Sequence, residues 1–129
     1  MYILILSLFI ACLFPYLSKI PLAIAMKNQP SGYDNANPRL QQAKLSGFGA
    51  RALAAHQNSF ESLILFSSAI LTALATQHTS TTIQMLAIIY LISRCIYHLF
   101  YLLNWATLRS GIWLISLIAS LNILWLCLP

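Results

Sequence analysis

The chain has 129 residues, of which 60% are hydrophobic and only 7% are charged. A soluble domain carries about 25% charged residues, so this composition excludes an ordinary soluble domain and indicates a protein that lies in a lipid bilayer. The net charge of +5 comes mainly from basic residues between positions 19 and 51, a clustering that is typical of membrane orientation rather than of a nucleic-acid-binding face.

The first apolar segment, residues 1–26, is long enough to span a bilayer, which takes about 20 helical residues. It has no basic N-terminal region and is longer than the apolar part of a signal peptide, so we predict a retained helix rather than a cleaved leader. Pro15 and Pro21 predict a kink or a break near its cytoplasmic end, because proline removes a helical hydrogen bond.

A polar loop follows, in which a short amphipathic entry to the second helix is expected to begin near Pro38. Three further apolar segments predict helices over about residues 46–76, 81–107 and 109–128. The links between them are short, so neighbouring helices run antiparallel. We therefore predict an all-α fold, an up-and-down transmembrane four-helix bundle that takes up residues 1–129 as a single domain.

The basic residues also predict how the bundle is oriented. Lysine and arginine occur in the first and third loops but are absent from the second loop and from both termini. By the positive-inside rule, the first and third loops are cytoplasmic and both termini face the opposite side.

Polar residues interrupt the second helix in a regular pattern. Arg51, Asn58 and Glu61 stand at positions i, i+7 and i+10, which lie on one helical face. An ionisable side chain at this depth is costly, and such residues are usually functional. The chain has only two acidic residues, so the position of Glu61 at the head of an apolar run calls for an explanation.

The third helix carries a matching polar face. Arg94, Tyr97 and Tyr101 stand at positions i, i+3 and i+7, with His98 beside them. One interpretation is a structural ion pair between Glu61 and Arg94, with the tyrosines in an interfacial aromatic belt. The gathering of an amide, two phenols and several cations favours instead a small anionic polar ligand held at the bilayer boundary.

Several kinds of site are missing from the sequence. It contains no Ser/His/Asp or Cys/His nucleophile set, no pair of catalytic carboxylates, no glycine-rich phosphate loop and no metal-ligand spacing. An enzyme of this kind would therefore obtain its nucleophile from a substrate. The three cysteines lie in apolar sequence and are expected to be small buried residues, and the three tryptophans are expected to be interface anchors.

Two motifs resemble those of the MAPEG family, the membrane-associated proteins of eicosanoid and glutathione metabolism. The stretch "RALAAHQNSFE" resembles the second-helix signature that ends in Asn-x-x-Glu, matched here by Asn58 and Glu61. The stretch "RCIYHLFY" is similar to the third-helix pattern Arg-x-x-Tyr-x-x-x-Tyr, matched by Arg94, Tyr97 and Tyr101. Both motifs occur in order and on the expected helices, and the resemblance extends over nearly the whole chain.

A third, shorter stretch, "LRSG", resembles the start of the last helix in members of the family that place an arginine and a serine beside the glutathione sulfur. Arg109 and Ser110 match those two residues. The sequence departs from the family at Ala54, where several members have an arginine four residues before the asparagine. This departure bears on glutathione affinity more than on the fold.

The resemblance implies a homotrimer of four-helix subunits that binds glutathione between neighbouring subunits, near the cytoplasmic surface. Carried over residue by residue, Glu61 would accept the amino group of glutathione, and Asn58 and Tyr97 would bond its peptide groups. Arg94 would order Glu61 or meet a carboxylate, and Tyr101 would help to close the pocket.

Basic residues outside the two helix motifs take further roles in this resemblance. Lys27 would reach a carboxylate in the adjoining subunit, and Arg51 would replace the arginine missing at Ala54 or would face the cytosol. Arg109 would lie beside the sulfur, where a guanidinium lowers the pKa of a thiol and favours the nucleophilic thiolate. Ser110 would add a hydrogen bond.

The implied activity is that of a glutathione transferase or peroxidase. Its second substrate would be a hydrophobic electrophile or lipid hydroperoxide that enters from the bilayer between the first and fourth helices of adjacent subunits. A non-catalytic lipid-binding or scaffold protein of the same fold is the main alternative, which Ala54 favours. A transporter or channel subunit that uses Glu61 and Arg94 as a relay is a third.

Overall fold

The computed structural model describes residues 1–129 and consists of helices and connecting segments without strands. The helices are α1 (Tyr2–Lys27), α2 (Pro38–Ala43), α3 (Gly47–Ala75), α4 (Thr81–Leu102) and α5 (Ala106–Trp125). All but the short α2 are long and apolar enough to cross a membrane. The predicted all-α fold, a bundle of four potential membrane-spanning helices, is confirmed.

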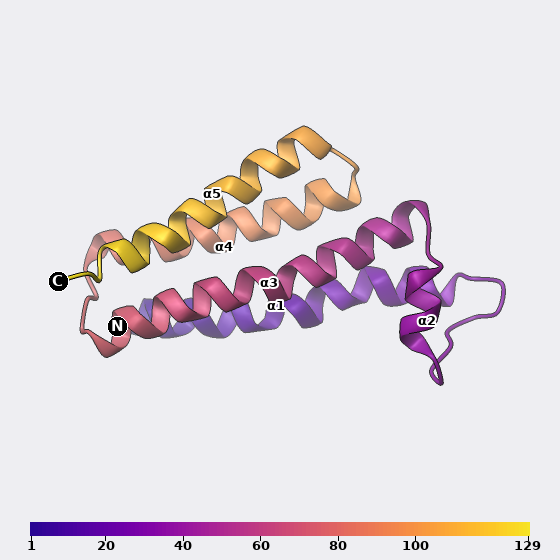
Figure 1. Ribbon diagram of the computed structural model, residues 1–129, viewed down its shortest axis with the longest axis horizontal. Coiled ribbons are helices and arrows are strands. Elements are labelled where there is room, and N and C mark those ends of the chain that lie inside the picture. The colour runs from indigo at the N-terminus through magenta and orange to yellow at the C-terminus, as the bar shows by residue number, and fades with distance from the viewer.

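The four long helices form two antiparallel pairs, α1 with α3 and α4 with α5, which lie alongside each other (Figure 1). Both chain termini lie at one end of the bundle together with the α3–α4 link. The α1–α3 connection, α2 and the α4–α5 turn lie at the other end, which we call the α2 end. The short helix expected near Pro38 is α2, and it is separate from α3.

The predicted break in α1 is wrong, because the helix continues through both Pro15 and Pro21. The hydroxyl of Ser18 donates a hydrogen bond to the carbonyl oxygen of Pro15 at 3.0 Å. This bond does not replace the ones that the prolines remove, which would go to the carbonyls of Ala11 and Leu17, four residues before each proline. Proline is tolerated inside a membrane helix where a neighbouring helix packs against it. Here α3 packs along α1 and supports it.

Two left-handed residues set the ends of α3 and α4. Gln77 and Asn104 have φ angles of 60° and 62°, a conformation that terminates a helix when the following amide bonds back to the last turn. The amide of Trp105 does so by donating to the carbonyl of Phe100 at 2.9 Å. The third long helix therefore ends at Leu102 rather than near 107, and residues 106–107 belong to α5.

The apolar core lies toward the end of the bundle that holds the termini. The rings of Phe66 and Tyr90 stack there with centroids 3.7 Å apart, and both side chains are buried. The expectation of three buried cysteines is correct for Cys127 but wrong for Cys12 and Cys95, whose side chains lie on the outer surface. A small apolar side chain is equally stable on a lipid-facing surface, so an apolar sequence context does not predict burial here.

The Phe66 ring provides a test of this packing. Phe66→Ala removes the stacked ring and leaves a cavity beside Tyr90, so we expect a loss of about 3 kcal/mol in unfolding free energy. Phe9→Ala is the matched control, because the Phe9 side chain is 60% exposed. Thermal unfolding in detergent measures both, and equal losses in the two variants would contradict the assigned core.

Candidate functional site

The site begins with Arg94 on α4, which is the largest fully buried side chain in the protein, at 1% exposure. Its Nη2 donates a hydrogen bond to Oδ1 of Asn58 on α3 at 2.8 Å. Its Cζ lies 4.2 Å from the centroid of the Tyr97 ring, within the range of a cation–π interaction. Its Nη1 is buried and has no hydrogen-bond partner, so the guanidinium still has a donor to offer.

Asn58 connects this guanidinium to Glu61. The amide nitrogen of Asn58 donates to Oε2 of Glu61 at 3.0 Å, while its amide oxygen accepts from Arg94. The direct ion pair between Glu61 and Arg94, which the sequence left open as a structural interpretation, does not form within 4.0 Å. A neutral amide therefore stands between the two charged groups, and the exposed Glu61 carboxylate keeps acceptor capacity.

Tyrosine rings extend the polar face from α4 to α5. The rings of Tyr97 and Tyr101 meet edge to face with centroids 5.5 Å apart. The guanidinium of Arg109 on α5 lies over Tyr101, with its Cζ 4.2 Å from the ring centroid. A continuous line of cations and aromatic faces therefore lies near the α2 end, formed by Arg94, Tyr97, Tyr101 and Arg109.

Two pockets open beside this line and share Asn58. One, of about 200 Å³, is lined by Asn58, Tyr97, Tyr101, Arg109, Ser110 and Trp113. The other, of about 120 Å³, is formed between α3 and α5 with Asn58, Glu61, Trp113 and two serines, Ser116 and Ser120, among its lining residues. Of the polar residues that the sequence predicts on the second and third helices, Asn58, Glu61, Tyr97 and Tyr101 border these hollows with residues of α5. Arg94 lines neither pocket and reaches them only through its bond to Asn58 and its contact with Tyr97.

Three predicted site residues need separate description. The Ser110 hydroxyl lines the larger of the two pockets and donates its one proton to the carbonyl of Ala106 at 3.1 Å, so it could donate to a ligand only by turning away from that carbonyl. Lys27 is exposed at the end of α1 and lines no pocket of this subunit. Arg51 lies in the first turns of α3, half-buried, and also lines none.

Trp113 is a pocket residue, whereas the sequence predicted only an interface anchor at this position. It lines both pockets that contain Asn58. Its position four residues after Arg109 places it on the same face of α5, and this spacing was the signal that could have identified it. The indole gives the site an apolar wall opposite the polar residues of α3 and α4.

His98 lies next to Arg94 in sequence but belongs to another part of the structure. Its Nδ1 lies 2.7 Å from the backbone oxygen of Arg94, and its ring stacks on Phe14 of α1. It lines an apolar cavity of about 310 Å³ with Pro21 and Leu102 rather than the Asn58 pockets. The ring therefore packs α4 against α1 and stands apart from the candidate site.

Comparison with known protein families gives a match over almost the whole chain. The family model described as MAPEG family matches residues 3–129. No curated protein and no solved structure matches the chain.

The bond from Arg94 to Asn58 can be tested by its contribution to stability. Asn58→Ala removes the one acceptor of the buried guanidinium, and we expect the unfolding free energy to fall by about 2–3 kcal/mol. Asn58→Asp keeps an acceptor oxygen and should lose much less. Thermal unfolding in detergent compares the three proteins, and an Asn58→Ala variant as stable as the wild type would show that the bond is unimportant.

Proposed function

Because the chain belongs to the MAPEG family, we propose that it is a glutathione-dependent transferase with peroxidase activity. The chain is an integral membrane protein with four helices suited to crossing the bilayer, of a family associated with glutathione and eicosanoid metabolism. Glutathione would bind in the Asn58 pockets, and a lipophilic second substrate would lie in the adjoining bilayer.

The buried Arg94 guanidinium is the observation that carries this proposal. It has an unbonded donor and no acidic partner within salt-bridge distance, and a buried charge without a counter-charge is costly. A carboxylate from a ligand would supply both the missing acceptor and the missing negative charge. Glutathione has two carboxylates, and the residues around Arg94 fit its other groups.

Glu61 and Asn58 supply the complementary contacts. The exposed Glu61 carboxylate would accept the ammonium group of glutathione, and Asn58 and Tyr97 would hydrogen-bond its peptide groups. Asn58 already fixes the positions of Glu61 and Arg94 through its two bonds, so these groups are held in place before the ligand arrives. Such preorganisation reduces the entropy cost of binding.

Arg109 would promote the chemical step. Its guanidinium is held over Tyr101 and lines the same pocket as Ser110. A positive charge about 4 Å from a sulfur contributes roughly 4 kcal/mol at a modest effective dielectric, before desolvation is counted. That energy corresponds to about three units in the pKa of the thiol, enough to make the thiolate common at neutral pH. Ser110 would donate a further hydrogen bond to the sulfur.

Both proposed reactions follow from one activated thiolate. In conjugation, the sulfur forms a bond to an electrophilic carbon while the leaving group departs with its electron pair. In peroxide reduction, a hydroperoxide and two glutathione molecules give an alcohol, water and glutathione disulfide. The apolar outer surface of the helices suits a second substrate that arrives from the bilayer.

The proposed assembly is a homotrimer, as in the family generally, with its first and third loops on the cytoplasmic side. In such a trimer Lys27, at the exposed end of α1, would reach a glutathione carboxylate in the adjoining subunit. Arg51 would act at the same interface, because its Nε has no partner within the subunit.

The alternative is a non-catalytic lipid-binding or scaffold protein of this fold. Two observations favour it: Ala54 lacks the guanidinium that several members of the family have there, and Arg51 does not line the Asn58 pockets. The intact group of Asn58, Arg94 and Arg109 favours the enzyme. A thiol-conjugation assay with and without glutathione distinguishes the two functions.

Arg109 provides the test of catalysis. Arg109→Ala should reduce conjugation of glutathione to 1-chloro-2,4-dinitrobenzene by about a hundredfold or more, because the thiolate loses its main stabilising charge. Glutathione should still raise the melting temperature of the variant, and Arg109→Lys should recover part of the activity. Full activity in Arg109→Ala would remove the catalytic assignment.

Glu61 provides the test of binding. Glu61→Gln should weaken glutathione binding about tenfold or more, because a charge-assisted hydrogen bond to the amino group is lost. Asp34→Asn is the matched control, since it removes the other acidic residue, whose carboxylate accepts loop amides far from the site. Binding is measured as thermal stabilisation by glutathione. Equal stabilisation of both variants would contradict the role of Glu61.

A further inference from the structure

The smaller of the two Asn58 pockets has room for the reactive end of a lipophilic substrate. It lies farther from the α2 end than the larger one, because Ser62 and Leu65 follow Asn58 along α3, and Leu117 follows Trp113 along α5. Asn58 and Trp113 line both pockets, so the two hollows adjoin. Its volume of about 120 Å³ is well below the roughly 300 Å³ of a small ligand-binding pocket, so it holds a functional group rather than a whole lipid.

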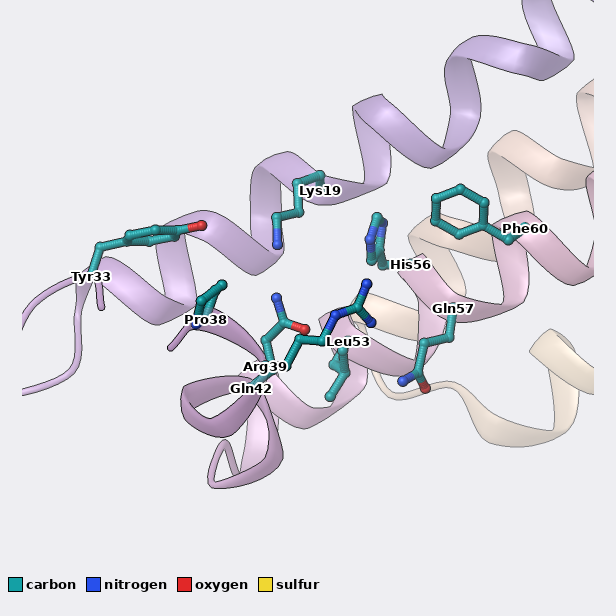
Figure 2. Close-up of a pocket in the computed structure, with 9 residues that line it drawn as sticks. All are labelled: Lys19, Tyr33, Pro38, Arg39, Gln42, Leu53, His56, Gln57 and Phe60. Carbon is teal, nitrogen blue, oxygen red and sulfur yellow. The ribbon is translucent and has the colours of Figure 1, made fainter. Parts of the chain in front are cut away.

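This pocket contains no cation. Glu61 is its one charged lining residue, whereas Lys19 and Arg39 line the largest pocket of the subunit, of about 460 Å³ between α1, α2 and α3. Figure 2 shows the ammonium group and the guanidinium of those two residues facing one common space. Glu61 repels a carboxylate, so the smaller Asn58 pocket favours an uncharged functional group.

Three serines line this pocket, and two of them have already donated their protons. Ser116 donates to the carbonyl of Trp113 at 2.7 Å, and Ser120 donates to the carbonyl of Ser116 at 3.1 Å, as serines within helices commonly do. Ser62 makes no bond to its own helix. Its Oγ lies 2.8 Å from the hydroxyl oxygen of Tyr90 on α4, and this is its one hydrogen bond within the subunit.

Burial decides which of these two hydroxyls is the donor. The pair has two protons, and the bond between them uses one. Tyr90 is 2% exposed and lines no pocket, so a bond donated by Ser62 would leave the phenol proton buried without an acceptor, which is costly. The phenol therefore donates to Oγ of Ser62, and the proton of Ser62 is left for the pocket.

Tyr90 also holds the Ser62 hydroxyl in place. The Tyr90 ring stacks on Phe66 with centroids 3.7 Å apart and ring planes 3° from parallel, so the position of the phenol oxygen is fixed. A hydroxyl that accepts one hydrogen bond becomes a stronger donor of the next. A fixed donor of this kind stabilises a transition state when it points to the atom on which negative charge develops.

We propose that Ser62 donates a hydrogen bond to the leaving oxygen when a lipid hydroperoxide is reduced, and that Tyr90 positions this donor. The inference rests on the proposed function, because it takes the thiolate from glutathione beside Arg109. The lipid chain passes Leu117 and lies along α5, where Leu121, four residues farther on the same helical face, is 47% exposed.

In this step the glutathione sulfur forms a bond to the terminal oxygen of the hydroperoxide. The O–O bond breaks, and the alkoxide leaves with the electron pair. The sulfur is oxidised to a sulfenic acid, and the alkoxide takes up the proton that glutathione lost when it ionised. A second glutathione then converts the sulfenic acid to the disulfide and water. Negative charge on the alkoxide is costly near Glu61, and the bond from Ser62 offsets that cost.

The inference predicts that Ser62 affects two reactions unequally. Ser62→Ala should lower kcat for reduction of linoleic acid hydroperoxide by about tenfold or more relative to kcat for conjugation to 1-chloro-2,4-dinitrobenzene, which breaks no O–O bond. Ser62→Thr, which keeps a hydroxyl, should restore most of the loss. Both reactions are measured with glutathione on the purified, full-length protein in uncharged detergent. Equal losses in the two reactions of Ser62→Ala would overturn the inference.

Ser68→Ala is the matched control for loss of a hydroxyl from α3. Ser68 is exposed, lines no pocket and donates to the carbonyl of Ile64 at 2.8 Å. The ratio of the two rates should therefore stay as in the wild type. A fall in this ratio as large as that of Ser62→Ala would overturn the inference in favour of a general effect on the helix.

Tyr90→Phe tests the positioning role and remains informative even where Ser62→Ala fails to fold. It removes one oxygen and keeps the ring that stacks on Phe66. The same ratio of rates should fall about threefold, because the Ser62 hydroxyl is then free to turn toward its own helix. A lower melting temperature with an unchanged ratio would overturn the positioning role and leave Tyr90 with a purely structural one.

The wild-type protein separates this inference from the proposed function. If the wild type catalyses both reactions and the Ser62 variants show no loss that is selective for the hydroperoxide, the inference alone is overturned. If the wild type catalyses neither reaction with glutathione, the proposed function is overturned, and this inference with it.

Discussion

A guanidinium enclosed within a membrane bundle is the constraint on which the site depends. Arg94 is 1% exposed and has one hydrogen bond to a side chain, from Nη2 to Asn58. In a medium where a buried charge is costly, the groups around it must either neutralise it or leave room for a ligand that does. The protein uses the Tyr97 ring and the Asn58 amide, neither of which carries a charge, so the site keeps its positive charge.

The choice of an amide rather than a carboxylate as the partner of Arg94 has consequences for Glu61. A direct pair would neutralise both groups and remove any electrostatic preference for a ligand. With Asn58 between them, the cationic and anionic groups stay separate, and each can meet the opposite charge of a zwitterionic ligand. Asn58 also joins α3 to α4 through this bond, so the arrangement that holds the site also holds two spanning helices together.

The sequence predicts those features that depend on local spacing. The four long helices follow from apolar length, and the faces formed by Arg94, Tyr97 and Tyr101 follow from helical periodicity. It does not predict features that depend on contacts between segments distant in the chain. Three features arise only when all five helices are placed together: the bridging position of Asn58, the place of Trp113 in both pockets, and the cavity between Lys19 and Arg39. The end of α4 was missed because Asn104 adopts a left-handed conformation without a neighbouring glycine or proline as a signal.

Positive charge is concentrated at the α2 end of the bundle. A membrane protein oriented by basic loops carries cations at one boundary, and these cations need counter-ions when the chain has few acidic residues. Here the cations divide into two groups. Arg94 and Arg109 both lie against tyrosine rings, and the buried Arg94 is screened little by water and salt, whereas Lys19 and Arg39 line an open cavity. The surroundings of each group, rather than its charge alone, therefore decide how strongly it would attract an anion: Arg94 is enclosed with an unpaired Nη1, whereas Lys19 and Arg39 face an open cavity.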